Sequence, residues 1–139
     1  MNKYILLIDD DEEELEIFSE ALNEIKKPMS CIQSRSGASA ISLLSYLMPD
    51  YIFLDLNMPE MDGLKCLDEI KKTKEPYNVP VILYSHTITD ETYKRAFEAG
   101  AAACIKKPAT VHTLAEILQE IFSIDVPLKN ALFLKGKNI

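Results

Sequence analysis

Short apolar runs that alternate with helix-like segments constrain the fold of this chain most strongly. Apolar runs that predict strands occupy residues 4–8, 30–33, 51–54, 80–84 and 102–105. Apolar residues recur at helical spacing over residues 12–25, 38–47, 63–72, 89–99 and 110–123. Parallel neighbouring strands need crossover helices, and such crossovers are right-handed. The alternation therefore predicts an α/β fold with a doubly wound, five-stranded parallel sheet and helices on both faces.

Helix-breaking and capping residues support these boundaries. Pro28 and Pro49 block the first two helices, because proline cannot continue a helix. Gly100 suits the position just after the fourth helix, and Thr110 can cap the last one. Residues 1–124 are therefore expected to form one domain. Residues 125–139 are expected to be a C-terminal tail without an output domain.

Polar side chains gather where the predicted strands end. Asp9 and Asp10 follow the first strand, Asp55 the third, Ser85 the fourth and Lys107 the fifth. In an open parallel sheet, ligands bind just outside the carboxyl ends of the strands. The sequence therefore predicts one site that contains carboxylates, a hydroxyl and an ammonium group.

The neighbours of these residues receive other interpretations. Lys106 is expected to point away from the site, since successive strand residues face opposite sides of a sheet. Glu12, Glu13 and Glu14 are interpreted as residues that face the positive end of the first helix, with no functional role.

The expected site suggests phosphoryl chemistry. Carboxylates held close together need a cation, and oxygen ligands without His or Cys favour Mg²⁺. Aspartate can act as a nucleophile that forms an acyl phosphate, and Asp55 is the candidate. Lys107 could neutralise the transferred group, and the Ser85 hydroxyl could donate a hydrogen bond to it.

Four motifs together resemble the receiver domain of two-component response regulators, over residues 3–123. They are Ile8-Asp9-Asp10-Asp11, the D-x-N-M-P-x-M-D-G stretch at residues 55–63, Tyr84-Ser85 and Lys107-Pro108. The resemblance implies a flavodoxin-like sheet in the strand order 2-1-3-4-5.

The resemblance also implies roles for individual residues. Asp9, Asp10, Asp55 and the main-chain carbonyl of Asn57 would bind Mg²⁺. Asp55 would accept a phosphoryl group from a sensor histidine kinase or phosphotransfer protein, Lys107 would pair with that group, and Ser85 would be the switch. Such a domain catalyses its own phosphorylation and dephosphorylation and is not otherwise an enzyme. Whether phosphorylation causes two copies to dimerise through the fourth helix, fifth strand and fifth helix stays an open question.

Three residues depart from the family pattern. Cys104 stands where the family usually has an aromatic residue that moves with the switch hydroxyl. Ala109 stands where phenylalanine is common, and His86 where a small residue is usual. With Cys104, the usual movement of an aromatic side chain together with the switch hydroxyl is in question. The bulky His86 beside Ser85 suggests an altered lifetime of the acyl phosphate.

Composition limits the partners and the compartment. The net charge of −7 and the pI near 4.8 argue against binding of nucleic acid or anionic lipid through the overall field. The apolar runs are far too short to span a membrane. Three widely spaced cysteines suit reduced thiols in the cytoplasm.

Three functions remain as hypotheses. The first is a single-domain phosphoacceptor that signals by contact with a downstream protein, which the sequence does not identify. The second is a receiver-like binding module that works without phosphorylation, suggested by Cys104 and Ala109. The third is a Mg²⁺-dependent phosphatase with an Asp nucleophile; Asn57, two residues after Asp55, argues against it because an amide cannot protonate a leaving group.

Overall fold

The computed structural model describes residues 3–27, 29–74, 79–123 and 134–135. A parallel sheet runs through its centre in the order β2-β1-β3-β4-β5, with β6 added beyond β5. The first five strands are β1 (Lys3–Ile8), β2 (Met29–Ser34), β3 (Tyr51–Leu54), β4 (Val81–Ser85) and β5 (Ala103–Lys106). The predicted flavodoxin-like strand order is confirmed.

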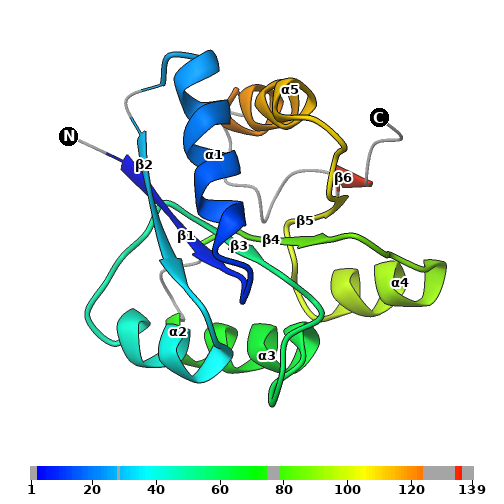
Figure 1. Cartoon of the computed structure of the whole chain (residues 1–139). Coiled ribbons are helices and arrows are strands. Elements are labelled where there is room, and N and C mark those ends of the chain that lie inside the picture. Colours follow the sequence, from blue (N-terminus) through cyan, green and yellow to red (C-terminus); the bar gives the residue numbers. More distant parts are fainter. Residues whose placement is uncertain (1–2, 28, 75–78, 124–133, 136–139) are drawn as a thin grey trace.

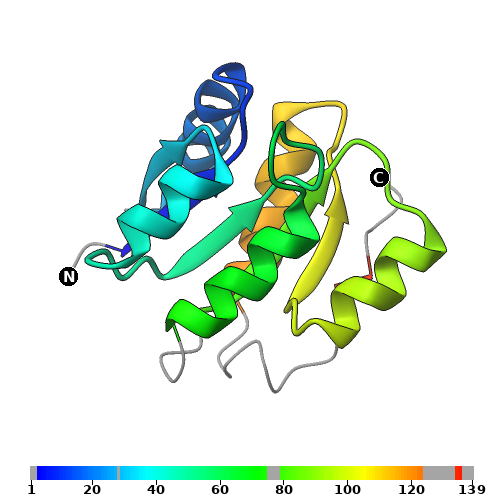
Figure 2. The same ribbon diagram turned by 90° about the horizontal axis from the view of Figure 1, so that it is seen from below.

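Five helices cover the two faces of this sheet. They are α1 (Glu13–Glu24), α2 (Gly37–Leu44), α3 (Gly63–Lys74), α4 (Asp90–Glu98) and α5 (Val111–Phe122). Figure 1 shows α1 and α5 on one face and α2, α3 and α4 on the other. Figure 2 views the same arrangement from the side of α2, α3 and α4. The fold is therefore doubly wound, as the sequence predicts.

A short sixth strand, β6 (Leu134–Lys135), lies beside β5 at the edge of the sheet. It pairs in parallel with β5, Leu134 opposite Ala103 and Lys135 opposite Cys104. The sequence pattern predicts no strand in the tail at residues 125–139. Apart from β6, that tail lies outside the described residues.

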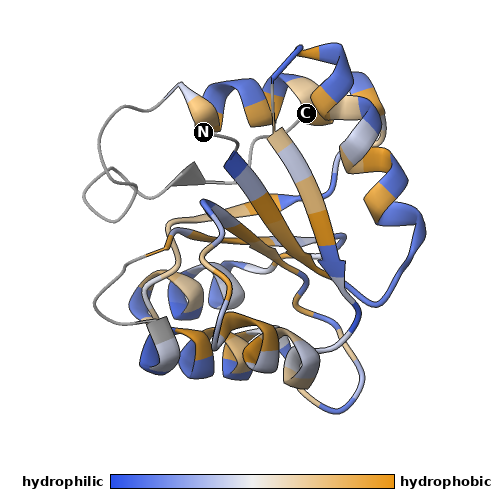
Figure 3. Ribbon diagram, turned by 90° about the vertical axis from the view of Figure 1, so that its left-hand side faces the viewer, coloured by the Kyte–Doolittle hydropathy of each residue, from blue (hydrophilic) through white to orange (hydrophobic). Residues whose placement is uncertain are grey.

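Continuous apolar runs in the strands supply two cores, one on each face of the sheet. Successive residues of a strand point to opposite faces of the sheet and therefore enter opposite cores. Toward α1 and α5 lie Ile5, Leu7, Phe53, Ile82 and Tyr84. Toward α2, α3 and α4 lie Leu6, Ile8, Ile52, Leu54 and Leu83. Figure 3 shows apolar colour along the central strands and hydrophilic colour in the acidic segment between β1 and α1. Because both faces are covered, the polar carboxyl edge is where a ligand can approach.

Side-chain caps fix the helix starts. Ser36, Thr89 and Thr110 each accept a hydrogen bond from the main-chain N–H three residues later. Gly100 follows α4 with a φ of +93°, a conformation that glycine adopts without strain. The α2 helix ends at Leu44, three residues before the predicted end, and the N–H groups of Ser45 and Tyr46 then donate to main-chain oxygens three positions earlier.

Candidate functional site

The ends of β1 and β3 carry two acids on rigid backbone. The main-chain N–H of Asp9 donates to Ser34 O at 3.0 Å, and that of Asp55 donates to Ile8 O at 2.9 Å. Both residues therefore continue the sheet hydrogen bonding by one step. The Asp9 residue is 0% exposed and Asp55 is 6% exposed, whereas Asp10 is half-buried. The carboxylates are thus fixed by the sheet and largely shielded from water.

The three acids converge as the sequence predicts. Asp9, Asp10 and Asp55 each offer a carboxylate oxygen, and these oxygens lie within 4.8 Å of one another. An all-oxygen set of this size, partly open to solvent, fits a hard divalent cation such as Mg²⁺ or Mn²⁺ that keeps some of its water. The position of the Asn57 carbonyl as a further ligand stays a prediction.

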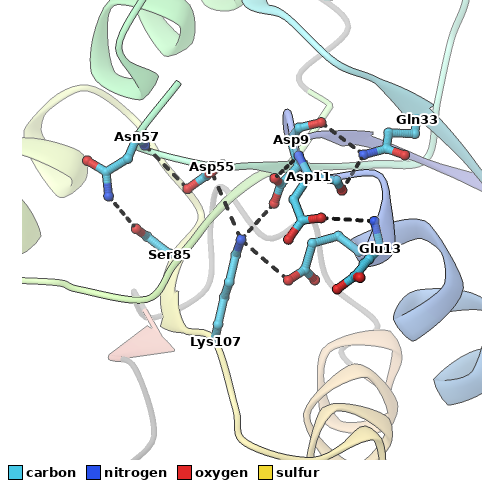
Figure 4. A network of polar contacts seen from close by, with 9 residues as sticks. Asp9, Asp11, Glu13, Gln33, Asp55, Asn57, Ser85 and Lys107 are labelled. Atoms are coloured by element: carbon cyan, nitrogen blue, oxygen red, sulfur yellow. Dashed lines mark hydrogen bonds and ion pairs between the residues drawn. The ribbon is translucent and has the colours of Figure 1, made fainter. Parts of the chain in front are cut away.

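Lys107 reaches this cluster from the end of β5. Its main-chain N–H donates to Ser85 O at 2.8 Å, which fixes the start of its side chain. Its Nζ lies 2.8 Å from Asp9 Oδ2 and 4.0 Å from Asp55 Oδ2. Figure 4 marks both contacts with dashed lines. Lys106 is exposed instead, in line with the predicted alternation. The amine is therefore bound to one acid and close to another.

Burial and charge shift the pKa values of these groups. Burial raises the pKa of Asp55, with help from the Asp9 charge, while the Lys107 charge opposes the rise. Burial alone would lower the pKa of Lys107, but the hydrogen bond and charge of Asp9 and the charge of Asp55 raise it. Lys107 is therefore charged at neutral pH.

Ser85 is fully buried at the end of β4 and already has a partner. The Asn57 side-chain amide donates to Ser85 Oγ at 3.1 Å, and the Asn57 main-chain N–H donates to Asp55 Oδ1 at 3.3 Å. Figure 4 shows Asn57 joined to each of the two residues by a dashed line. One residue thus links the hydroxyl to the central carboxylate.

Two residues of the site were not predicted. Gln33 Nε2 donates to the main-chain oxygens of Asp9, at 2.9 Å, and Asp11, at 2.8 Å, and so ties β2 to the acidic loop. Glu14, for which the sequence predicts no functional role, is buried, with Oε1 3.5 Å from Lys107 Nζ. Burial raises the pKa of Glu14, while the Lys107 charge opposes this.

Gly63 allows the loop after β3 to fold back on itself. A Cβ atom at Gly63 would lie 2.6 Å from Leu56 Cα and 2.7 Å from Asp55 O. The Gly63 N–H donates to Leu56 O at 2.9 Å. The close approach of two backbone segments therefore requires glycine here, directly behind Asp55.

The residues that depart from the family pattern differ in burial. Cys104 is fully buried, and the Tyr93 hydroxyl of α4 donates to its main-chain oxygen at 3.2 Å. His86 and Ala109 are exposed. An aromatic residue from α4, rather than from β5, thus contacts the strand at this point.

The doubly wound sheet with an acidic cluster and a lysine at its carboxyl edge defines a flavodoxin-like α/β protein with an edge site. Residues 5–119 match the model of the response regulator receiver domain. The chain therefore belongs to the response regulator receiver family of two-component systems.

Two of the sequence relatives are response regulators of different lengths. The chain is 31% identical over 116 residues to the probable C4-dicarboxylate response regulator DctR of Bacillus subtilis, covering 84% of this chain and 50% of that protein. It is 27% identical over 119 residues to the polar-differentiation response regulator DivK of Brucella ovis, covering 86% of this chain and 95% of DivK. The chain thus spans half of one relative and nearly all of the other.

Solved structures agree with this assignment. The phosphorylated cyanobacterial phytochrome response regulator RcpA superposes with a TM-score of 0.76 at 28% identity, covering 87% of this chain and 91% of RcpA. The Mn²⁺-bound response regulator Rcp1 superposes with a TM-score of 0.75 at 25% identity, covering 94% of this chain and 98% of Rcp1. Within the described ranges, no helix has the length and apolar character needed to cross a membrane.

Proposed function

We propose that Asp55 accepts a phosphoryl group from the phosphohistidine of a sensor kinase or phosphotransfer protein, in a Mg²⁺-dependent reaction. The observation that carries this proposal is the convergence of Asp9, Asp10 and Asp55 with the Lys107 amine at one edge of the sheet. The phosphorylated state of RcpA and the metal in Rcp1 support it by similarity.

The transfer itself needs little covalent help from the protein. An Asp55 carboxylate oxygen forms a bond to phosphorus as the bond from phosphorus to the histidine nitrogen breaks, and the imidazole leaves. Lys107 Nζ, 4.0 Å from Asp55 Oδ2, has a short way to move to the incoming oxygens. The rigid ends of β1 and β3 hold the acceptor in place during the reaction.

Asp9, Asp10 and Asp55 would hold the Mg²⁺ ion, with the Asn57 main-chain carbonyl as a further ligand. When bound, the ion supplies positive charge that offsets the repulsion between the carboxylates and the phosphoryl oxygens. The chain contributes the orientation of these ligands. Lys107 contributes the second positive charge.

Signalling would follow from a change of partner at Ser85. In the structure its hydroxyl accepts a hydrogen bond from Asn57. After phosphorylation it would donate to a phosphoryl oxygen and draw the segment between β4 and α4 toward Asp55. The resulting change at α4 and β5 would be sensed by a downstream protein or a second copy of the chain.

The protein would catalyse only its own phosphorylation and dephosphorylation and would have no other substrate. A cytoplasmic location suits its three cysteines, Cys31, Cys66 and Cys104, which are all free thiols. Recognition of a kinase and a target would depend on protein contacts at the carboxyl edge and beside α4.

Incubation with acetyl phosphate and Mg²⁺, followed by intact-mass measurement, tests the proposal. The wild type should gain one phosphoryl group, and Asp55→Asn should gain none. Asp68→Asn, an exposed acid on α3, is the matched control and should react as the wild type does. Lack of an adduct on the wild type would favour the hypothesis of a binding module that works without phosphorylation. An adduct on Asp55→Asn would overturn the assignment of the acceptor.

A further inference from the structure

Glu14 is a buried carboxylate in the first turn of α1. It is 5% exposed, while its neighbours Glu12, Glu13 and Glu16 are exposed. The positive end of the helix favours acids throughout the first turn, so the helix dipole does not explain why this side chain alone turns inward. Its inward direction instead brings it to the functional site.

The contacts of Glu14 are incomplete. Oε1 lies 3.5 Å from Lys107 Nζ, and Oε2 is buried without a hydrogen-bond partner. Burial of a carboxylate costs free energy unless charge or hydrogen bonds compensate for it. Lys107 supplies the compensating charge and therefore holds Glu14 in the site.

The Lys107 amine thus lies close to three carboxylates. Its Nζ lies 2.8 Å from Asp9, 3.5 Å from Glu14 and 4.0 Å from Asp55. The acceptor is the most distant of the three. Phosphorylation would add a group with a charge of about −1.5 to −2 at Asp55, and this group would attract the same amine.

We propose that Glu14 is a positioning residue that competes for the Lys107 amine and so lowers the affinity of the site for a phosphoryl group on Asp55. This inference rests on the proposed function of Asp55. In the unphosphorylated protein, Glu14 and Asp9 hold the amine on the side of the site formed by α1 and β1. When the phosphoryl group arrives, Lys107 turns to Asp55 and Glu14 loses its counter-charge. The unphosphorylated state is thereby favoured.

Glu14→Gln removes the charge and keeps the size and shape of the side chain. Glu13→Gln is the matched control, because it removes the same charge from an adjacent, exposed position on α1. The probe is beryllofluoride, a stable mimic of the phosphoryl group, titrated in excess Mg²⁺ and followed by amide resonances. We expect Glu14→Gln to bind beryllofluoride about threefold to tenfold more tightly than the wild type, the scale of one nearby charge. Glu13→Gln should bind like the wild type.

A double-mutant cycle separates competition for the lysine from other effects. The gain in beryllofluoride affinity from Glu14→Gln should largely disappear when Lys107→Met is also present. An equal gain in both backgrounds would overturn the proposal, since it would show that Glu14 repels the anion directly. Unchanged or weaker binding by Glu14→Gln would also overturn it.

The proposed function has its own readout in the same experiment. If the wild type binds beryllofluoride and Glu14→Gln does not differ from it, the inference fails and the proposed function stands. If the wild type does not bind, both fail. Glu14→Asp keeps the charge on a shorter side chain and should lie between the wild type and Glu14→Gln. Cooperative thermal unfolding of each variant verifies that it is folded.

Discussion

The Lys107 amine donates a hydrogen bond to the Asp9 carboxylate at 2.8 Å. Asp9 is also a proposed Mg²⁺ ligand, so the lysine and the metal share one fully buried carboxylate. The lysine partly neutralises the site when no metal is bound. A bound metal would weaken the attraction between Asp9 and Lys107 and make the amine easier to move toward Asp55.

Binding of Mg²⁺ should stabilise the fold. At a Mg²⁺ concentration ten times the dissociation constant, we expect about 1.4 kcal/mol of added unfolding free energy, because the ligand binds only the folded state. Thermal unfolding in MgCl₂ and in NaCl of equal ionic strength measures this difference. Asp10→Asn should lose most of the effect, whereas Asp68→Asn should retain it. An equal rise in Asp10→Asn would place the metal elsewhere.

The Asp55 carboxylate should destabilise the metal-free protein at neutral pH. Because burial raises its pKa in the folded state, protonated Asp55 favours folding, and this contribution is lost as pH rises through the folded pKa. Asp55→Asn stays neutral and should be more stable than the wild type at pH 7 in EDTA. The difference should shrink as pH falls below that pKa. Urea unfolding at several pH values measures it, and a difference independent of pH would contradict this account.

The ends of the strands could be predicted from local sequence pattern alone, because each apolar run stops at a polar residue. Asp9, Asp55 and Lys107 lie where the parallel sheet brings these ends together. Register explains the agreement, since Ile8 pairs with Leu54 and the next residues are the two acids. Local spacing was therefore sufficient for this part of the site.

Other features depend on contacts between distant elements. Glu14 lies on the same face of α1 as the buried residues Phe18 and Ala21. Apolar periodicity does not identify it as buried, because its side chain is a carboxylate. The role of Gln33 arises because β2 lies beside β1, a neighbour relation that no local pattern contains. The β6 strand has only two residues and depends on pairing with the distant strand β5.

Gln33 should maintain the geometry of the acidic loop. Its amide bridges the main-chain oxygens of Asp9 and Asp11 and thereby holds Asp10 between them. Loss of an outer contact that orients metal ligands typically weakens metal binding by about tenfold or more. We therefore expect Gln33→Ala to bind Mg²⁺ about tenfold more weakly in a calorimetric titration. Gln119→Ala, at an exposed position on α5, is the control and should not differ from the wild type.

Two glycines should respond differently to alanine. At Gly63 a Cβ atom meets backbone atoms of Leu56 and Asp55, which cannot move without shifting the loop behind the acceptor. At Gly37 the nearest atom, at 2.8 Å, is the sulfur of the flexible Met61 side chain. We expect Gly63→Ala to cost about 2 to 3 kcal/mol and Gly37→Ala less than about 1 kcal/mol. Chemical denaturation measures both, and equal costs would contradict the contact argument.

Ser85 should transmit phosphorylation rather than permit it. Its hydroxyl is bound to Asn57, not to the acceptor, so Ser85→Ala should still form the adduct on Asp55. The change should cost less than about 1 kcal/mol of stability, since the exposed Asn57 amide can donate to water instead. On addition of beryllofluoride and Mg²⁺, amide resonances of α4 and β5 should shift much less than in the wild type. Ser85→Thr keeps the hydroxyl and should restore the shifts. A full response in Ser85→Ala would show that the signal leaves the site by another route, such as the contact between Tyr93 and Cys104.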